Sequence, residues 1–442
     1  MRGNPGIWAN STFLLTCAVW TLPLFASVRH ASDLGWSPGQ DVTSKLDALL
    51  GSGILGPGDE LVLDHTYRIS GTHQLPDDFT LSAIQGAGFD VTDAHTNKDL
   101  LRLGHRTTLR NLTLTYLNTP ALGPKGTNPV RHEDFTNRIG IYASGKSDVR
   151  IENCRMIGSI NHHIKLSGCR RPRVISSHIQ GGFWTVYLVG DVTDPVFRNC
   201  VIEQCQGDAI KTGMGGDGTQ RALVESCVFQ DNGRDGIDTT GGFKDSTVRN
   251  SLFRRLFSGM DIKSLYEQPS HVASGMRNTG IDVQNCRFTD MNTAISLSTL
   301  DRGLAYNGHY FLNASNCHEY APHDIDLDDC VVERTGTTNG RMLLLKGGHT
   351  VRYQNARFLS NPGVTVDIVS YSNVYEVFGP KSLSKPVSDA LNYGVTGWLG
   401  PSGLPGAPGD TSVPFSYGPV PEPTPLVLLG LGALGVLRRR WR

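Results

Sequence analysis

The sequence predicts an all-β solenoid, a parallel β-helix in which short strands of successive coils stack side by side. Three observations predict it. One short pattern of apolar, polar and small residues recurs nine times, the recurrences are mostly 23 to 27 residues apart, and apolar and polar residues alternate within each one. A period in this range is typical of solenoids, and alternation is typical of strands with one buried face.

Each recurrence of the pattern centres on a small polar residue, which we call the anchor. The residue two positions before every anchor and the residue three positions after it are apolar, although only 38% of the chain is apolar. We therefore expect both apolar columns to face the interior of the solenoid. The anchors are Asn111, Asn153, Ser176, Asn199, Ser226, Asn250, Asn285, Asp329 and Asn355.

Cysteine is concentrated in one column of the repeat, because five of the nine cysteines directly follow an anchor. Equivalent residues of neighbouring coils lie about 4.8 Å apart in a parallel stack, so these thiols would form a ladder inside the solenoid. We predict that they contribute to packing rather than to disulfides or a metal site. They are Cys154, Cys200, Cys227, Cys286 and Cys330.

A second strand follows most anchors by roughly ten residues. Its outward positions are predicted to form an exposed ladder that is first aromatic and basic and then acidic. The ladder consists of Tyr142, Lys165, Tyr187, Lys211, Asp238, Asp261 and Ser296, with Asp208, Arg234, Asp235 and Lys263 nearby.

The segment from Asp41 to Ser70 predicts a capped helix, a turn and a strand. It resembles the entry segment of pectate-lyase-like β-helix proteins, in which a helix covers the first coil. The resemblance implies a right-handed parallel β-helix with an N-terminal capping helix. Two stretches rich in Gly, Pro or charge, at 116–136 and 265–279, are expected to project as loops.

The N-terminus predicts export. An apolar stretch follows Arg2 and ends near the small residues Ala26 and Ser27, as in a secretory signal peptide. We divide the chain into a signal peptide (1–31), the N-terminal cap and first coils (32–105), the β-helix repeats (106–370), a tether rich in Gly, Pro and Ser (371–419), and a C-terminal signal (420–442).

The C-terminal signal begins with Pro421, Glu422 and Pro423, continues with an apolar segment at 426–437, and ends in a basic tail. It resembles the PEP-CTERM sorting signal. The resemblance implies processing by an exosortase-type enzyme and a location in the Gram-negative cell envelope or extracellular matrix. It also implies that the protein meets the membrane only through this segment, as a short transmembrane helix.

The balanced net charge argues against a partner that is attracted by the charge of the whole protein, such as nucleic acid. The chain has 41 basic and 41 acidic residues, so no field of one sign exists to attract nucleic acid. We expect a monomer whose partner is an extracellular, acidic polysaccharide, because a flat parallel sheet offers a long surface for a linear sugar chain. That expectation is an analogy at the level of the fold.

The mixed charges of the ladder suggest the chemistry. For β-elimination or epimerisation of a uronate polymer, Lys211 or Lys263 could neutralise the sugar carboxylate, and Tyr187 or a lysine could accept the proton. Asp238 and Asp261 could instead form the carboxyl pair of a glycoside hydrolase. The spaced motifs of the polygalacturonases are missing, so a lyase or an epimerase is the first hypothesis.

Lys165, Tyr187, Asp208, Arg234 and Asp235 are the expected substrate-binding residues. A carbohydrate-binding or matrix protein without catalytic activity is the alternative function. In that case the charged residues of the ladder would simply pair with one another on an exposed sheet.

Two further groups of residues lie near position 324. His323 and Asp324 follow a proline and resemble the site of β-helical mannuronan epimerases, although Ala321 stands where that family has Asp. Asp324, Asp326, Asp328 and Asp329 could suggest calcium, but they lack the spacing of a defined calcium loop. We therefore predict no cofactor, with calcium as the one ion to test.

Overall fold

The computed structural model describes residues 26–122, 138–213, 215–240, 242–264, 277–299 and 322–335, and shorter strand segments from 340 to 418. Residues 1–25 of the predicted signal peptide, most of the two predicted loops, most of the tether and the whole C-terminal signal lie outside the described residues. In the described part of the chain, no helix is long and apolar enough to cross a membrane, and the predicted C-terminal membrane segment is not among the residues examined.

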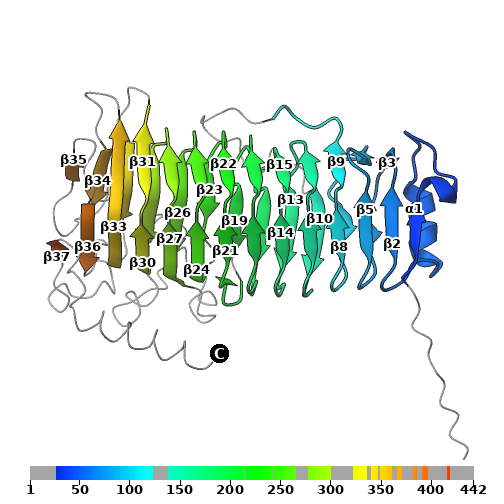
Figure 1. Ribbon diagram of the computed structural model, residues 1–442, viewed down its shortest axis with the longest axis horizontal. Coiled ribbons are helices and arrows are strands. Elements are labelled where there is room, and N and C mark those ends of the chain that lie inside the picture. The colour runs from blue at the N-terminus through cyan, green and yellow to red at the C-terminus, as the bar shows by residue number, and fades with distance from the viewer. Residues whose placement is uncertain are drawn as a thin grey trace, which may run out of the picture.

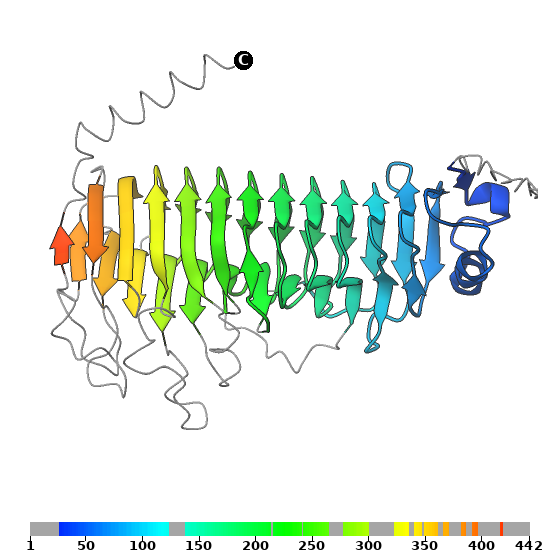
Figure 2. The ribbon, with the colours of Figure 1, turned by 90° about the horizontal axis from the view of Figure 1, so that it is seen from below.

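The chain winds into a single row of coils (Figure 1), and each coil contributes a strand to each of three parallel sheets, A, B and C. The predicted all-β solenoid is confirmed. Figure 2 shows the same row from below, with the helix α1 (Thr43–Gly51) at the N-terminal end.

Sheet A runs the length of the solenoid. Its strands are β1 (Val28–His30), β2 (Glu60–Leu63), β5 (Thr80–Ala83), β8 (Thr108–Arg110), β11 (Arg150–Glu152), β14 (Arg173–Ile175), β17 (Val196–Arg198), β20 (Thr219–Gln220), β21 (Leu223–Glu225), β24 (Phe243–Arg249), β27 (Asn278–Gln284), β30 (His323–Asp328), β33 (His349–Ser360) and, antiparallel at the end, β36 (Leu391–Thr396) and β37 (Ser416–Gly418).

Sheet B receives the next strand of each coil. Its strands are β3 (Thr66–Ile69), β6 (Gly88–Val91), β9 (Thr113–Tyr116), β12 (Arg155–Ile157), β15 (His178–Gln180), β18 (Val201–Glu203), β22 (Val228–Gln230), β25 (Leu252–Arg254), β28 (Arg287–Thr289), β31 (Val331–Arg334) and the second half of β33.

Sheet C completes each coil. Its strands are β4 (His73–Gln74), β7 (Asp99–Arg102), β10 (Ile139–Ser144), β13 (His162–Ser167), β16 (Val186–Val189), β19 (Ile210–Gly213), β23 (Asp235–Asp238), β26 (Ser258–Ser264), β29 (Thr293–Thr299), β32 (Gly340–Lys346), β34 (Val366–Ser370) and the antiparallel β35 (Ser382–Lys385).

The anchors form the turn between sheets A and B. All nine have a positive φ, between 48° and 60°. Asparagine adopts this left-handed conformation more readily than most residues, which explains why it dominates the column. Asn153 Nδ2 donates to Asn111 Oδ1 at 2.8 Å, and Asn285 Nδ2 donates to Asn250 Oδ1 at 2.9 Å. The anchors therefore bend the chain and also bridge neighbouring coils.

The five cysteines that follow anchors are buried and have free thiols, so the predicted interior ladder is confirmed. Each Sγ lies close to a backbone carbonyl of its own coil, as in Cys154 with Glu152 O at 3.3 Å and Cys227 with Glu225 O at 3.4 Å. The small thiol fits beside the turn and shares its acceptor with the backbone N–H of an anchor on a neighbouring coil, Asn111 for Glu152 O and Asn199 for Glu225 O.

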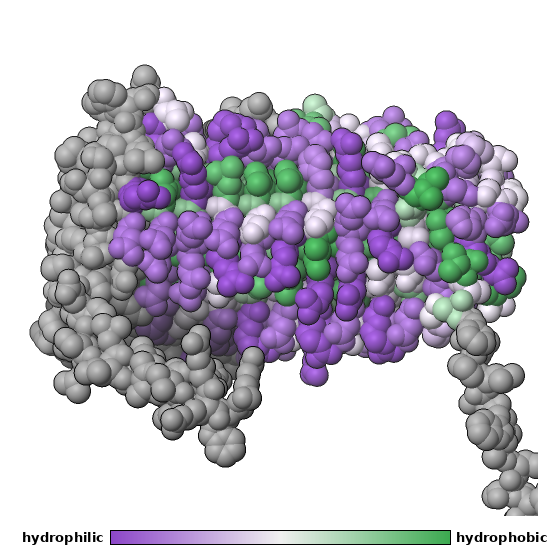
Figure 3. Space-filling view, in the orientation of Figure 1, coloured by the Kyte–Doolittle hydropathy of each residue, from purple (hydrophilic) through white to green (hydrophobic). Residues whose placement is uncertain are grey.

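The predicted apolar columns face inward. Phe229, Phe253 and Phe288 stack on successive coils of sheet B, with ring centroids 4.8 Å and 5.0 Å apart. Outward positions are mainly polar, and the face shown in Figure 3 is accordingly mostly hydrophilic. Alternation within the strands thus separates the core from the surface, as the sequence pattern predicts.

Replacing the middle ring of this stack should destabilise the solenoid strongly. Phe253 is fully buried between two rings, so Phe253→Ala should cost about 3–5 kcal/mol of unfolding free energy. Urea unfolding followed by circular dichroism would measure the loss. Arg254→Ala on the outward side of the same strand is the matched control, and an equal loss in both variants would contradict the importance of the stack.

The helix α1 closes the N-terminal end. The N-cap residue Val42 makes no side-chain cap, but Asp41 just before it accepts a hydrogen bond from the Thr43 N–H through Oδ1 at 3.0 Å, and Leu46 and Leu49 are buried beneath the helix. The predicted capped helix is therefore present, although two strands, β2 and β3, follow it instead of one. Covering the first coil hides backbone groups that would otherwise pair with another chain.

Candidate functional site

The second strand of the sequence pattern becomes sheet C, and its outward positions stack in one row, which we call the outer row. The strand register places each member beside the next on neighbouring coils, in the order expected from the sequence. The row is Tyr142, Lys165, Tyr187, Lys211, Asp238, Asp261 and Ser296.

The acidic part of this region is buried, which corrects the expectation of a solvated, exposed stripe. Asp208, Asp235 and Asp238 are only 0%, 5% and 2% exposed. The side chains of Lys211 and Lys263 are 12% and 19% exposed. Lysine side chains from neighbouring coils lie against the shorter aspartates, and alternation along one strand does not predict contacts of this kind.

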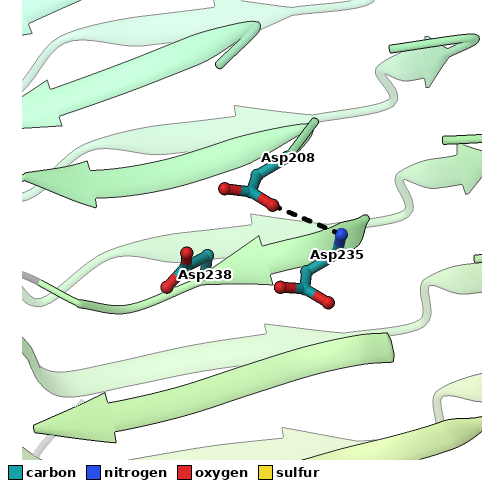
Figure 4. A group of neighbouring side chains, drawn as sticks. All are labelled: Asp208, Asp235 and Asp238. Atoms are coloured by element: carbon teal, nitrogen blue, oxygen red, sulfur yellow. Dashed lines mark hydrogen bonds between the residues drawn. The ribbon is translucent and has the colours of Figure 1, made fainter. Parts of the chain in front are cut away.

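Asp208, Asp235 and Asp238 form a compact group that we call the acid cluster (Figure 4). Each offers a carboxylate oxygen within 4.8 Å of the others. Asp208 precedes β19, whereas Asp235 and Asp238 are the first and last residues of β23 on the next coil. The backbone N–H of Asp235 donates to Asp208 Oδ1 at 3.4 Å. Two adjacent coils therefore build one site.

Gly236 explains how Asp235 and Asp238 fit on the same short strand. A Cβ at this position would lie 2.6 Å from Phe253 Cδ1 and 2.7 Å from the Gly259 carbonyl oxygen. The core phenylalanine of the next coil occupies the space that a side chain would need. The short sequence Asp-Gly-Ile-Asp can therefore place both carboxyl groups outward while the backbone packs against the core.

Asp238 is surrounded by hydrogen-bond donors. Lys211 Nζ donates to Asp238 Oδ2, and Lys263 Nζ lies 3.2 Å from the same oxygen. Thr240 Oγ1 donates to Asp238 Oδ1 at 2.6 Å. Lys263 Nζ also contacts Asp261 Oδ2 at 2.7 Å. Asp238 is thus the anionic centre of a buried ion-pair network.

The three carboxyl groups of the acid cluster differ in protonation. Burial raises the pKa of Asp208 to about 6, although Lys211 opposes the shift. Burial, reinforced by the charges of Asp261 and Asp208, raises the pKa of Asp235 well above its usual value. Burial acts in the same direction on Asp238, but the Lys211 and Lys263 ammonium groups outweigh it and hold its pKa well below the ordinary range. One buried acid is therefore ionised beside one that stays protonated.

Two oxygens of the acid cluster are available for new hydrogen bonds. Asp208 Oδ2 and Asp235 Oδ1 are buried and have no hydrogen-bond partner in the part of the chain that the structure describes. Asp208 Oδ2 lies 3.5 Å from Lys211 Nζ, as an ion pair. Buried polar atoms normally have partners, so these two unsatisfied oxygens are the candidates within the acid cluster for contact with a ligand.

A metal ion does not fit the acid cluster. Three carboxylates are a common ligand set for calcium or magnesium, but both ammonium groups already contact Asp238. A cation would be repelled by the two lysines and would have to displace them. Among the described residues, no other group of three metal-ligating side chains converges, and this includes the aspartates of β30.

Aromatic side chains lie next to the acid cluster on its N-terminal side. The His162 ring stacks on Tyr187, with centroids 4.8 Å apart, and lies parallel to Trp184 at 5.9 Å. Trp184 and Tyr187 are 5.1 Å apart, and Lys211 Nζ lies 5.0 Å from the centre of the Trp184 ring. We call His162, Trp184 and Tyr187 the aromatic platform.

Sequence reasoning missed His162 and Trp184. His162 lies two positions before the inward Ile164, and Trp184 lies two positions before the inward Val186. Asp208 and Asp235 hold the same position on the following coils. Following this second outward column would have found them. It would also have led to Phe257, which adjoins that column beside Ser258 and is 56% exposed. An exposed phenylalanine at the edge of a polar site is a candidate contact for a sugar ring.

Arg234 takes a different position from the one expected of a substrate-binding cation. Its guanidinium carbon lies 5.4 Å from the centre of the buried Phe183 ring. Its carbonyl oxygen accepts a hydrogen bond from the Phe257 N–H at 3.0 Å. Arg234 therefore borders the acid cluster and supports the turn that presents Phe257.

His323 and Asp324 lie on β30 of sheet A, whereas the acid cluster lies on sheet C. His323 Nε2 is 3.8 Å from Asp324 Oδ2, and Asp324 is exposed. Asp326 and Asp328 point outward from the same strand, and Asp329 is an anchor. The structure therefore does not bring the epimerase-like pair together with the charges of the outer row.

Family models and solved structures agree with this architecture. Residues 80–253 match the model described as right handed beta helix region, and residues 419–440 match the PEP-CTERM protein-sorting motif. No curated protein matches the sequence.

Two solved structures share the fold at low sequence identity. One is a polygalacturonase from Erwinia carotovora ssp. carotovora, with 13% identity, a TM-score of 0.57, and coverage of 79% of this chain and 96% of the other. The second is the DFA-IIIase from Arthrobacter chlorophenolicus A6 without its lid, with 9% identity, a TM-score of 0.53, and coverage of 76% and 90%.

The C-terminal motif indicates export followed by C-terminal processing. The three parallel sheets and the family match both identify the described coils as a right-handed parallel β-helix. The chain is a right-handed parallel β-helix protein that carries a PEP-CTERM sorting motif at its C-terminus.

Proposed function

We propose that this exported protein is a glycoside hydrolase that cleaves an extracellular polysaccharide at the acid cluster. The observation that carries the proposal is the divided protonation of three buried carboxyl groups within 4.8 Å of one another. Glycoside hydrolysis needs a protonated acid and an ionised carboxylate on opposite sides of one bond. The environment of the acid cluster supplies both forms at neutral pH.

The proposed reaction assigns one role to each carboxyl group. Asp235 donates its proton to the oxygen of the leaving sugar as the bond between that oxygen and the anomeric carbon breaks. Asp208 forms a covalent bond to the anomeric carbon as that bond breaks, as in a retaining hydrolase with closely spaced carboxyl groups. A water molecule then forms the new bond to the anomeric carbon, releases Asp208 as a carboxylate and gives its proton to Asp235. Asp208 and Asp235 are chosen because Asp208 Oδ2 and Asp235 Oδ1 have no hydrogen-bond partner among the described residues.

Asp238 is the positioning residue of this scheme. Thr240 contacts one of its oxygens and the two lysines contact the other. Asp238 therefore has no oxygen free to accept or donate a proton during the reaction. Its fixed negative charge holds Lys211 and Lys263 in place. Together with Asp261, it also disfavours ionisation of Asp235, which keeps the proton donor loaded.

The similar structures support a carbohydrate substrate. One of them is named as a polygalacturonase, and its fold matches nearly its whole length. Sorting to the cell envelope would place the protein where polysaccharides are the main polymers. The aromatic platform beside the acid cluster offers ring faces on which a pyranose could stack.

A lyase or an epimerase is the second candidate, favoured by the lysines beside the site. Both enzymes need a base for a ring proton. Burial acts to lower the pKa values of Lys211 and Lys263, but Asp238 and the other aspartates nearby together outweigh it, so both pKa values are raised and both lysines stay charged. Burial also raises the pKa of Tyr187. The groups expected to act as bases are thus protonated at neutral pH, which favours hydrolysis.

Product analysis separates these functions. The mature protein would be incubated with soluble uronans, glucans and fructans. New reducing ends without ultraviolet absorbance of an unsaturated uronate would support hydrolysis. Reducing ends with that absorbance would identify a lyase, and an altered epimer ratio by NMR would identify an epimerase. Retention of a polysaccharide with no change in it would replace the proposal by a binding protein.

The pH profile of kcat/KM is expected to fall on the acid side near pH 6. Asp208 must be ionised to attack the anomeric carbon, and its pKa is raised by burial to about 6. Activity should therefore decrease about tenfold for each pH unit below 6. Initial rates from pH 4 to 9 on one cleaved substrate would measure the profile. A flat profile between pH 4 and 7 would contradict the role of Asp208.

A further inference from the structure

Lys165 differs from Lys211 and Lys263 in having no acidic partner among the described residues. Among the described residues it forms no ion pair, whereas Lys211 and Lys263 both contact Asp238. Lys165 Nζ instead lies 5.8 Å from the centre of the Tyr142 ring and 5.6 Å from that of Tyr187. The two rings belong to the coils on either side. Lys165 is thus a positive charge held between two rings, and no acid in the described part of the chain neutralises it.

The position of Lys165 is matched to the acid cluster. Lys165 pairs with Tyr187, and Tyr187 pairs with Lys211, whose coil also carries Asp208. Two steps of about 4.8 Å therefore separate Lys165 from that coil along the solenoid axis. This span is comparable to the length of a disaccharide. A sugar chain lying along sheet C would bring one unit over Lys165 while another reaches the acid cluster.

The aromatic platform fills the interval between these two points. Tyr187 lies between Lys165 and Lys211 in the outer row, and His162 and Trp184 pack against it. Ring faces bind the apolar side of a sugar ring but do not discriminate charge. Lys165 would supply the discrimination, because a lone ammonium is best satisfied by an anionic group.

We propose that Lys165, held between Tyr142 and Tyr187, is a subsite for an acidic sugar, and that the polysaccharide therefore carries anionic groups along its length. The placement of the subsite relative to the scissile bond rests on the proposed hydrolase function, but the recognition of an anionic sugar does not. Carboxylate and sulfate groups share the required chemistry. Arginine at this position should substitute in part, and an uncharged side chain of equal length should not.

Binding measurements test the subsite independently of cleavage. Asp235→Asn would be introduced into all variants, so that ligand is not consumed, and calorimetry would measure affinity for a galacturonan oligomer and for its methyl ester. Lys165→Met should weaken binding of the acidic oligomer about tenfold to a hundredfold, as expected for loss of one charge-assisted contact. Binding of the neutral ester should change less than twofold, and Lys165→Arg should retain most of the affinity.

Controls separate a specific contact from a general change in charge. Lys45→Met removes the same charge from the helix α1, at the N-terminal end of the solenoid and away from Lys165 and the acid cluster, and should leave both affinities unchanged. A sulfated glucan and its parent glucan form a second pair, which shows whether sulfate replaces carboxylate. If the parent protein binds both members of each pair equally, or if Lys165→Met weakens both equally, the subsite is disproved.

The two proposals fail in distinguishable ways. Selective loss of acidic-oligomer binding in Lys165→Met, with no cleavage of any polysaccharide by the otherwise unaltered protein, would support the subsite and overturn the hydrolase. Cleavage that is abolished by Asp235→Asn but is insensitive to substrate charge and to Lys165→Met would support the hydrolase and overturn the subsite.

Discussion

Asp235→Asn is expected to reduce kcat/KM by about 10²–10⁴-fold while leaving the fold intact. The asparagine amide has nearly the shape of the protonated carboxyl group, but it cannot give a proton to the leaving oxygen. The loss should be largest for substrates with poor leaving groups, because they depend most on protonation. Initial rates on natural polysaccharide and on an activated aryl glycoside would measure this difference.

A matched control uses another aspartate with an outward side chain. Asp326→Asn on β30 makes the same chemical change on sheet A, away from the acid cluster, and should leave the rate unchanged. The melting temperature of Asp235→Asn should remain close to that of the parent, because burial disfavours the charge of Asp235. Full activity in Asp235→Asn would remove Asp235 from the mechanism and, with it, the proposed reaction.

Asp238→Ala is expected to destabilise the protein by about 3–5 kcal/mol near neutral pH. Asp238 is the shared partner of Lys211 and Lys263, so removing it leaves two buried ammonium groups close to each other. Urea unfolding would measure the change. The folded-state pKa of Asp238 is lowered, so its stabilising effect is present above about pH 4, near the ordinary pKa of an aspartate.

The sign of the pH dependence follows from that lowered pKa. As the pH falls through the folded-state pKa, Asp238 becomes protonated in the parent, and the difference between parent and variant should shrink. Lys211→Met in the Asp238→Ala background should restore part of the lost stability, because it removes one uncompensated charge. If the changes in unfolding free energy caused by Lys211→Met and Asp238→Ala simply add at neutral pH, Lys211 and Asp238 are not coupled and their ion pair does not stabilise the fold.

Strand register could be predicted from the sequence because one-residue errors are costly in this fold. A shift of one position would turn the inward side chains of Ile237 and Met260 toward solvent and bury Asp238 and Asp261 in the core. The alternation of apolar and polar residues therefore fixes which side chains are neighbours across coils. The anchors add the turn position, since each adopts a left-handed conformation.

Burial and protonation within the acid cluster could not be predicted in the same way. In the sequence Asp238 is an ordinary outward residue with Asp208 and Asp235 nearby, and the burial of all three depends on side chains of neighbouring coils. The raised pKa of Asp208 and the lowered pKa of Asp238 result from the same burial combined with different distances to the lysines. A sequence pattern specifies which residues are neighbours, but not how closely their charged atoms approach.

The preferred chemistry changed for the same reason. From the sequence, Lys211 and Lys263 were natural partners for the carboxylate of a uronate in an elimination. In the structure both are paired with Asp238. The candidate to bind a substrate anion is instead Lys165. The sequence places its aromatic neighbours in the same row, but only the structure shows that it has no acidic partner within the described ranges.

The regular spacing of the coils also fixes the distance between Lys165 and the acid cluster. Each turn of the chain advances the outer row by one strand spacing, and Lys165 and Lys211 lie on coils separated by a single intervening one. Duplication or loss of that intervening coil during evolution would change the distance between the charged contact and the bond-breaking residues by one fixed increment. Relatives of this protein with one coil more or fewer could in this way bind sugar chains of different lengths, with the same residues at the charged contact and at the acid cluster.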